Sequence, residues 1–147
     1  LMIALLILYQ NNKTFRRLSS TDPLTGLLNR SGFDQLVDRY LSTHPQERCV
    51  CAALDIDDFK FINDLYGHSM GDQVLRQLAD EMRKMFPDNA ILGRNGGDEF
   101  CILLPNCARK DVEAQIQAFA SKPRTFLVDS TSRPFSISLG YTDCQVR

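Results

Sequence analysis

Residues 90–104 read AILGRNGGDEFCILL, two apolar runs separated by a short polar segment. Each run has the length and the composition of a β-strand. The segment between them, from Asn95 to Asp98, consists of residue types that tolerate the positive φ of a tight turn. The stretch therefore predicts an antiparallel hairpin that carries two acids, Asp98 and Glu99, at its tip.

Another apolar run, at 48–56, reaches Asp55 near its end and is followed by Asp57. If this strand lies beside the hairpin, the acids of both gather at one edge of the sheet. Carboxylates that lie so close together repel one another unless a cation or a proton compensates, and Mg²⁺ takes oxygen ligands of this kind. Because Gly96 and Gly97 have no side chains, they would let a polyphosphate approach the backbone while the acids hold its metal ion.

Each of these residues also has a simpler interpretation. Asp57 or Asp58 could cap a helix that begins at Phe59, and paired acids beside a turn are often a solvated surface. His68 alone is more typical of a hydrogen-bonded structural histidine than of a ligand or a base. Taken one residue at a time, the patterns leave both interpretations open.

Helical and strand patterns alternate along the rest of the chain. They predict an α+β fold, with helices over a sheet that includes at least one antiparallel hairpin. The expected helices lie at 1–20, 31–43, 57–67, 69–86 and 109–121, and the expected strands at 48–56, 90–94, 99–104, 125–130 and 133–143.

The composition limits the number of domains and the class of partner. With 147 residues, 44% of them hydrophobic, the chain has enough material for one domain with a real core. The net charge of −1 offers no excess of basic residues to neutralise phosphates, so we expect no nucleic-acid partner. Five cysteines without a CxxC pair predict reduced, mostly buried thiols rather than disulfides or a zinc site.

The chain opens with the apolar stretch LMIALLILYQ, which is followed by the basic residues Lys13, Arg16 and Arg17. This order resembles the cytoplasmic edge of a membrane helix, so residues 1–20 are expected to be the tail of a membrane helix or a signalling linker. An amphipathic helix that packs on a partner or on the domain explains the same sequence equally well.

Three separated motifs together resemble the GGDEF family of diguanylate cyclases. They are DPLTGLLNRSGF at 22–33, DIDDFKFINDLYGHSMGD at 55–72 and RNGGDEF at 94–100. The resemblance implies a central, mostly antiparallel sheet flanked by helices, similar to the nucleotidyl cyclase and polymerase palm (ferredoxin-like) fold. It also implies that a homodimer condenses two GTP molecules into cyclic di-GMP and releases pyrophosphate, in the presence of Mg²⁺ or Mn²⁺.

The resemblance assigns the metal and catalytic residues. The metal ligands are expected to be the Asp55 side chain, the Ile56 carbonyl and the Asp98 side chain, with Glu99 as a further contact. Glu99 is also the candidate for deprotonating the 3′-hydroxyl. The resemblance thus gives Asp98 and Glu99, together with Lys60 along the triphosphate, as the expected catalytic residues.

The same resemblance assigns the substrate-binding residues. They are Phe59, Lys60, Asn63, His68, Asp72, Gly96 and Gly97. Asn63 and Asp72 are expected to bind the guanine, because an amide and a carboxylate together match its acceptor and donor edge.

The chain departs from the family pattern in two places. Many members carry an inhibitory Arg-x-x-Asp shortly before the signature, and Pro87 and Ala90 replace its Arg and Asp here, so no inhibitory site is expected. Members also continue into a last helix with a phosphate-binding Lys and Arg, whereas this chain stops at Arg147. We therefore expect 21–147 to be a GGDEF domain that is incomplete at its C-terminal end.

The sequence leaves two functions in competition. One is the cyclase, and the other is a catalytically inactive GTP-binding module that regulates a neighbouring domain. The intact signature at 94–100 favours the cyclase. The entry segment predicts a cytoplasmic domain whose parent protein lies in the bacterial inner membrane, with a sensor domain upstream.

Overall fold

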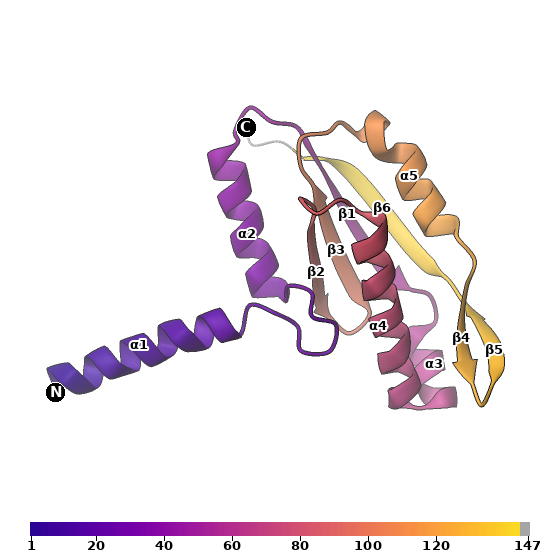
Figure 1. Ribbon diagram of the computed structural model, residues 1–147, viewed down its shortest axis with the longest axis horizontal. Coiled ribbons are helices and arrows are strands. Elements are labelled where there is room, and N and C mark those ends of the chain that lie inside the picture. Colours follow the sequence, from indigo (N-terminus) through magenta and orange to yellow (C-terminus); the bar gives the residue numbers. More distant parts are fainter. Residues whose placement is uncertain (145–147) are drawn as a thin grey trace.

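The computed structural model describes residues 1–144, with residues 12–18 described as part of a helix but without their side chains. The chain forms the α+β fold that the sequence predicts, with helices around a sheet (Figure 1). The helices are α1 (Met2–Leu18), α2 (Arg30–Thr43), α3 (Phe59–Tyr66), α4 (His68–Met85) and α5 (Arg109–Ser121). The strands are β1 (Cys49–Ile56), β2 (Ile91–Gly96), β3 (Glu99–Leu104), β4 (Arg124–Val128), β5 (Thr131–Phe135) and β6 (Ile137–Cys144).

The main sheet has the order β2-β3-β1-β6, and all three pairings in it are antiparallel. Strands β4 and β5 form a separate hairpin whose turn residues, Asp129 and Ser130, both have positive φ. The sequence predicted one strand at 133–143, but the chain divides this run between the two sheets. The division falls at Ser136, whose carbonyl accepts a hydrogen bond from the Asp57 backbone as the chain leaves β4 and joins β1.

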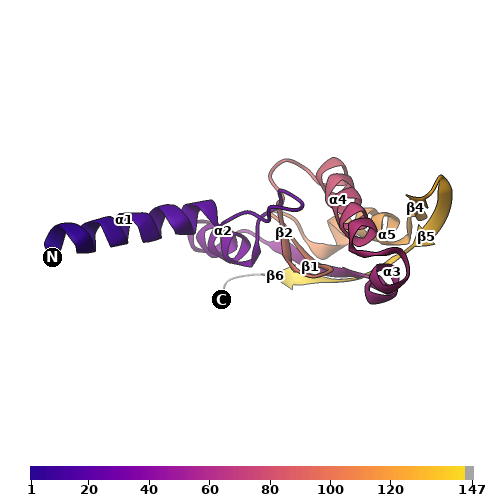
Figure 2. The ribbon, with the colours of Figure 1, turned by 90° about the horizontal axis from the view of Figure 1, so that it is seen from below.

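The main core lies between one face of the sheet and helices α4 and α5. Alternate residues of β1, from Val50 to Ile56, point into it, and the odd-numbered residues of the same strand face the other way. Helix α4 contributes fully buried residues such as Leu78 and Met82, and α5 contributes Phe119. Figure 2 shows α4 on this side of the sheet.

Helix α2 packs on the opposite face and covers only one end of it. Its side chains Phe33 and Val37 form a second, smaller core with Cys49 and Leu103. Asn29 begins the helix by accepting a hydrogen bond from the Gly32 backbone amide at 2.9 Å. Because α2 stops short of the other end of β1, the sheet remains open around Asp55.

Helix α1 projects away from the rest of the chain in both views (Figures 1 and 2). Its described side chains, residues 1–11, are all exposed. No helix within residues 1–144 has both the length and the apolarity needed to cross a membrane. Lys13, Arg16 and Arg17, on which the membrane-edge prediction depends, have side chains outside the described part of the chain.

The five cysteines are free thiols. Cys49 and Cys101 are buried, and the other three are half-buried. The thiols are unpaired, as the sequence predicts, but only two of the five are buried where most were expected to be.

Candidate active site

The open end of the sheet face forms a cavity of about 450 Å³. Strands β1, β2, β3 and β6 all contribute to its lining, which consists of Ala53, Leu54, Asp55, Asn95, Glu99, Phe100, Ser138, Leu139 and Gly140. Residues from separate parts of the sequence meet here because the sheet order places β1 between β3 and β6.

Two of the predicted metal ligands are cross-strand neighbours. Asp55 of β1 lies opposite Glu99 of β3 in the strand register, and both are exposed. Directly opposed residues of an antiparallel pair have Cβ atoms about 5 Å apart, which brings the carboxylates within reach of a shared cation. Asp98, half-buried, precedes Glu99 at the tip of the hairpin.

The residues described do not form a ready-made metal cluster. No three His, Cys, Asp or Glu side chains within them are arranged to hold an ion. The set expected from the sequence needs only two or three carboxylates and the Ile56 backbone, and these are hard oxygen donors that suit Mg²⁺. The available oxygen donors are therefore of the chemical type that Mg²⁺ binds.

Asp57 has partners of its own. Its carboxylate accepts hydrogen bonds from the Ser136 hydroxyl at 2.6 Å and from the Ser138 hydroxyl. These two bonds hold the pKa of Asp57 below its ordinary value of 3.8. The Asp57 side chain thus links the end of β1 to the start of β6. It does not cap α3: Asp58 occupies the cap position, and its side chain makes no cap hydrogen bond.

The hairpin turn, residues 96–99, is here called the signature turn. Gly96 and Gly97 have φ angles of +111° and +53°, which L side chains rarely adopt. A Cβ atom at either position would meet no other atom within 4 Å. The glycines are therefore required by backbone conformation, and the space above them is open to a ligand.

The predicted guanine-binding residues lie where α3 meets α4. Asn63 and Asp72 are both half-buried, on α3 and α4 respectively, and Phe59 packs partly against the core. Lys60 and His68 are exposed. The substrate-binding residues thus belong to two groups, one between these helices and one at the signature turn.

Sequence analysis missed Gly71 as a residue of this region. A Cβ atom there would lie 1.9 Å from Oδ1 of Asn63, so only glycine lets this side chain lie against α4. The signal was present in the sequence as an isolated glycine inside a helical pattern, which often marks a close approach.

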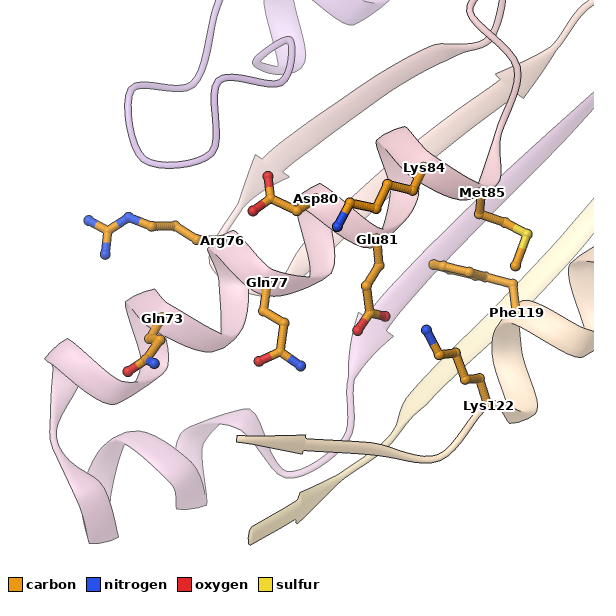
Figure 3. A pocket seen from close by; sticks show the side chains of 9 residues that line it. All are labelled: Gln73, Arg76, Gln77, Asp80, Glu81, Lys84, Met85, Phe119 and Lys122. Carbon is orange, nitrogen blue, oxygen red and sulfur yellow. The ribbon is translucent and has the colours of Figure 1, made fainter. Parts of the chain in front are cut away.

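A further hollow of the described chain lies away from these residues. It has a volume of about 630 Å³ and lies along α4 beside the end of α5 (Figure 3). None of the site residues predicted from the sequence lines it. Glu81, one of its lining residues, forms a structural ion pair with the buried Arg124 at 2.7 Å.

Comparison with known proteins supports the sequence motifs. The family model "Diguanylate cyclase, GGDEF domain" matches residues 19–145. Cyclic di-GMP phosphodiesterase PdeR of Escherichia coli K12 is 35% identical over 89% of this chain, and probable diguanylate cyclase DgcE of the same organism is 42% identical over 67%. The chain spans only 19% and 9% of the lengths of these two relatives.

A solved structure agrees with the fold. The coiled coil and GGDEF domain of DgcB from Caulobacter crescentus, in complex with c-di-GMP, superposes with a TM-score of 0.79 at 29% identity. The match covers 98% of this chain and 79% of that one. Together with the match of the family model, this superposition shows that the chain belongs to the GGDEF family of diguanylate cyclase domains and has its palm-like cyclase fold.

Proposed function

We propose that this domain condenses two GTP molecules into cyclic di-GMP and releases pyrophosphate. The observation that carries the proposal is the pairing of Asp55 with Glu99 beside an open glycine turn. Oxygen donors gathered at one place, with room for a phosphate next to them, are what phosphoryl transfer requires, because positioning and charge neutralisation supply most of its catalysis.

The reaction assigns a role to each residue. A bound Mg²⁺ or Mn²⁺ would offset the charge that develops on the transferred phosphoryl group. The Asp55 and Asp98 side chains and the Ile56 carbonyl would hold that ion. Glu99 would add a further contact or accept the proton of the 3′-hydroxyl, and Lys60 would neutralise charge on the triphosphate.

The remaining predicted residues would orient the nucleotide. Asn63 and Asp72 are proposed to bind the guanine between α3 and α4, near His68. Phe59 would lie along the triphosphate, and Gly96 and Gly97 would border it. In each half-reaction, the 3′-oxygen of one GTP bonds to the α-phosphorus of the other, the bond to the pyrophosphate oxygen breaks, and the hydroxyl proton goes to a base.

The domain is proposed to act as a homodimer. One domain holds one GTP, so two domains must face each other across a two-fold axis to place each 3′-hydroxyl in line with the partner's α-phosphate. Helix α1, which leaves its described side chains exposed, offers a way to hold two copies together.

A GTP-binding module without catalysis is the second candidate. It is favoured by one observation, the 35% identity to a relative whose name is that of a phosphodiesterase. The cyclase remains the first choice because the chain keeps Asp55, Asp98 and Glu99, which a binding module does not need.

Helix α1 is also proposed to attach the domain to the inner membrane, with the domain on the cytoplasmic side and a sensor upstream. The large apolar residues among 1–9 are between 50% and 100% exposed. Because they follow one another over about two helical turns, this segment is apolar on all sides, which suits lipid better than it suits a single packed face. Flotation with vesicles of phosphatidylethanolamine and phosphatidylglycerol tests this, and a chain lacking residues 1–9 that floats equally well would contradict it.

The deciding experiment incubates the protein at high concentration with GTP and Mg²⁺ and separates the products by chromatography. We expect cyclic di-GMP from the wild type and none from Asp98→Ala. Asp88→Ala, an exposed acid in the turn after α4, serves as the matched control and should match the wild type. GTP binding without product, in this chain and in a longer one that includes the last helix expected from the family resemblance, would favour the binding module instead.

A further inference from the structure

The turn that joins the entry helix to the domain, residues 22–28, is closed by its own hydrogen bonds and is here called the entry turn. The Asp22 carboxylate accepts hydrogen bonds from the Thr25 backbone amide at 3.0 Å and from its hydroxyl at 2.6 Å. The Asp22 amide donates to the Leu27 carbonyl at 2.7 Å. These hydrogen bonds hold the entry turn together as one unit.

This unit is attached to the free edge of the sheet. Leu28 donates a backbone hydrogen bond to Leu92 at 3.2 Å and accepts one from Arg94 at 2.8 Å. Together they make a parallel bridge between Leu28 and Gly93. A displacement of the entry turn is thus transmitted to β2, the strand that leads into the signature turn.

Arg94 makes the connection to the signature turn itself. Its Nη1 lies 2.9 Å from Oδ1 of Asp22, and its Nε donates to the Gly97 carbonyl at 2.9 Å. The side chains of Arg94 and Asp22 are each only 13% exposed, so water screens their ion pair weakly. One rigid guanidinium therefore joins the entry turn to the residue that precedes Asp98.

We propose that Arg94 is a positioning residue: it fixes the Gly97 carbonyl, and with it the direction of Asp98, relative to the entry turn. Movement of α1 then changes the metal-holding geometry through Asp22 and Arg94. This inference rests on the proposed function. It makes the Asp22–Arg94–Gly97 contact the route by which an upstream segment controls turnover.

The contact should act more on the rate than on nucleotide affinity. Arg94 lies on the edge strand, whereas the proposed guanine contacts lie between α3 and α4. A loosened signature turn would leave the base bound but misplace the carboxylates, and a small misplacement of reacting groups can cost up to about a hundredfold in rate.

Arg94→Lys is the sharpest variant, because it keeps the charge but cannot donate to both Asp22 and Gly97 with fixed geometry. We expect kcat to fall about tenfold or more while KM for GTP changes less than about threefold. Arg83→Ala is the matched control: Arg83 also donates to the entry turn, at the Thr25 carbonyl, but does not touch the signature turn. Its kcat should stay within about twofold of the wild type.

A second variant tests whether the two residues act as one unit. Asp22→Asn keeps an oxygen for Thr25 but turns an amide toward Arg94, so it should lower kcat as Arg94→Lys does. The kcat of the double variant should be no lower than that of either single variant, because the effects of two residues that act through one contact do not add. Additive losses, or equal losses from Arg83→Ala and Arg94→Lys, would show a general loss of stability and overturn the proposal.

The nucleotide-free protein provides a readout that does not depend on activity. Because Arg94 holds the Gly97 carbonyl, we expect the NMR order parameters of the Gly97 and Asp98 backbone amides to fall to below about 0.6 in Arg94→Lys and to be unchanged in Arg83→Ala. If the wild type makes no cyclic di-GMP, the proposed function is wrong, but this measurement still tests the Asp22–Arg94–Gly97 contact. Unchanged order parameters in folded Arg94→Lys would refute the positioning role.

Discussion

Gly71 of α4 lies so close to Asn63 of α3 that a Cβ atom at position 71 would sit 1.9 Å from the Asn63 Oδ1. The same atom would lie 3.2 Å from Cζ of Phe59. Because the two helices are in contact through these residues, the spacing of the proposed guanine site depends on the absence of a side chain at Gly71. Gly71 would therefore matter to the proposed site although glycine itself offers no group to a ligand.

Replacing Gly71 with alanine is expected to be destabilising, although alanine normally favours a helix by about 1 kcal/mol over glycine. Overpacking against Asn63 should lower the free energy of unfolding by about 1–3 kcal/mol and displace the amide from GTP. Urea denaturation and calorimetry measure the two effects. Adding Asn63→Ser should restore stability but not GTP affinity, and a Gly71→Ala variant as stable as the wild type would contradict the contact.

Acid should unfold the domain in part through Asp22 and Asp57. Burial opposes ionisation of Asp22, but hydrogen bonds from Thr25 and Arg94 outweigh it and hold its pKa below 3.8. The pKa of Asp57 is lowered by Ser136 and Ser138. Groups with a depressed folded pKa stabilise the protein above their unfolded pKa, and this stability is lost as the pH falls through the folded value.

We therefore expect the stability to decline as the pH falls below about 4, with a shallower decline in Asp22→Asn and in Asp57→Asn. Thermal unfolding followed at a series of pH values measures these slopes. Asp88→Asn, an exposed acid for comparison, should keep the slope of the wild type. Identical slopes in all four proteins would mean that neither carboxylate is linked to folding.

The ion pair below the large hollow should be a strong structural contact. The Arg124 side chain is 0% exposed and lies 2.7 Å from Glu81, and it also donates to the Phe119 carbonyl at 2.6 Å. Glu81→Ala leaves this guanidinium buried without its partner, which costs about 3–5 kcal/mol of stability. Arg76→Ala, an exposed residue of the same hollow, should change the stability by less than about 0.5 kcal/mol in a denaturant titration.

Product inhibition through the usual inhibitory motif should be absent. Pro87 and Ala90 stand at its two positions and form a turn, in which the Ala90 amide donates to the Pro87 carbonyl at 2.9 Å. Neither side chain can grip a guanine with charged hydrogen bonds. Calorimetric titration with cyclic di-GMP should show no micromolar binding at this turn, and binding that Pro87→Gly or Arg83→Ala abolishes would disprove the prediction.

The buried thiols should resist modification. Burial raises the pKa of Cys101 to about 12, and burial together with nearby Cys144 raises that of Cys49 to about 12. The thiolate is the reactive form, so iodoacetamide at pH 7.5 should label Cys49 and Cys101 far more slowly in the folded protein than in urea. Mass spectrometry of the digested protein distinguishes the two sites, and equal labelling rates would show that the core opens readily.

Local patterns were sufficient for most of the individual elements. The helix expected at 109–121 is α5, and the hairpin around Gly97 has the strands that the sequence predicts, because helical periodicity and turn chemistry act over only a few residues. The four acids were also expected to meet at one sheet edge. Asp55 and Glu99 do, since the neighbouring strands place them in register.

Contacts between distant residues could not be predicted in this way. The sequence did not indicate that Asp57 binds Ser136 and Ser138, that Gly71 makes room for Asn63, or that the run at 133–143 serves two sheets. Each depends on which segments come together when the sheet closes. In the sequence, a serine, a glycine or a continuous strand pattern gives no sign of which distant segment it will contact.

The sequence by itself determined the family, the turn that needs Gly96 and Gly97, and the order of helices and strands apart from the division between β5 and β6, because motif and period are properties of neighbouring residues. Only the tertiary structure decided that Arg94 joins Asp22, 72 residues away, to the signature turn. The physical reason is that a guanidinium has several possible partners. The burial of its side chain and the geometry of the sheet edge select the two that it binds.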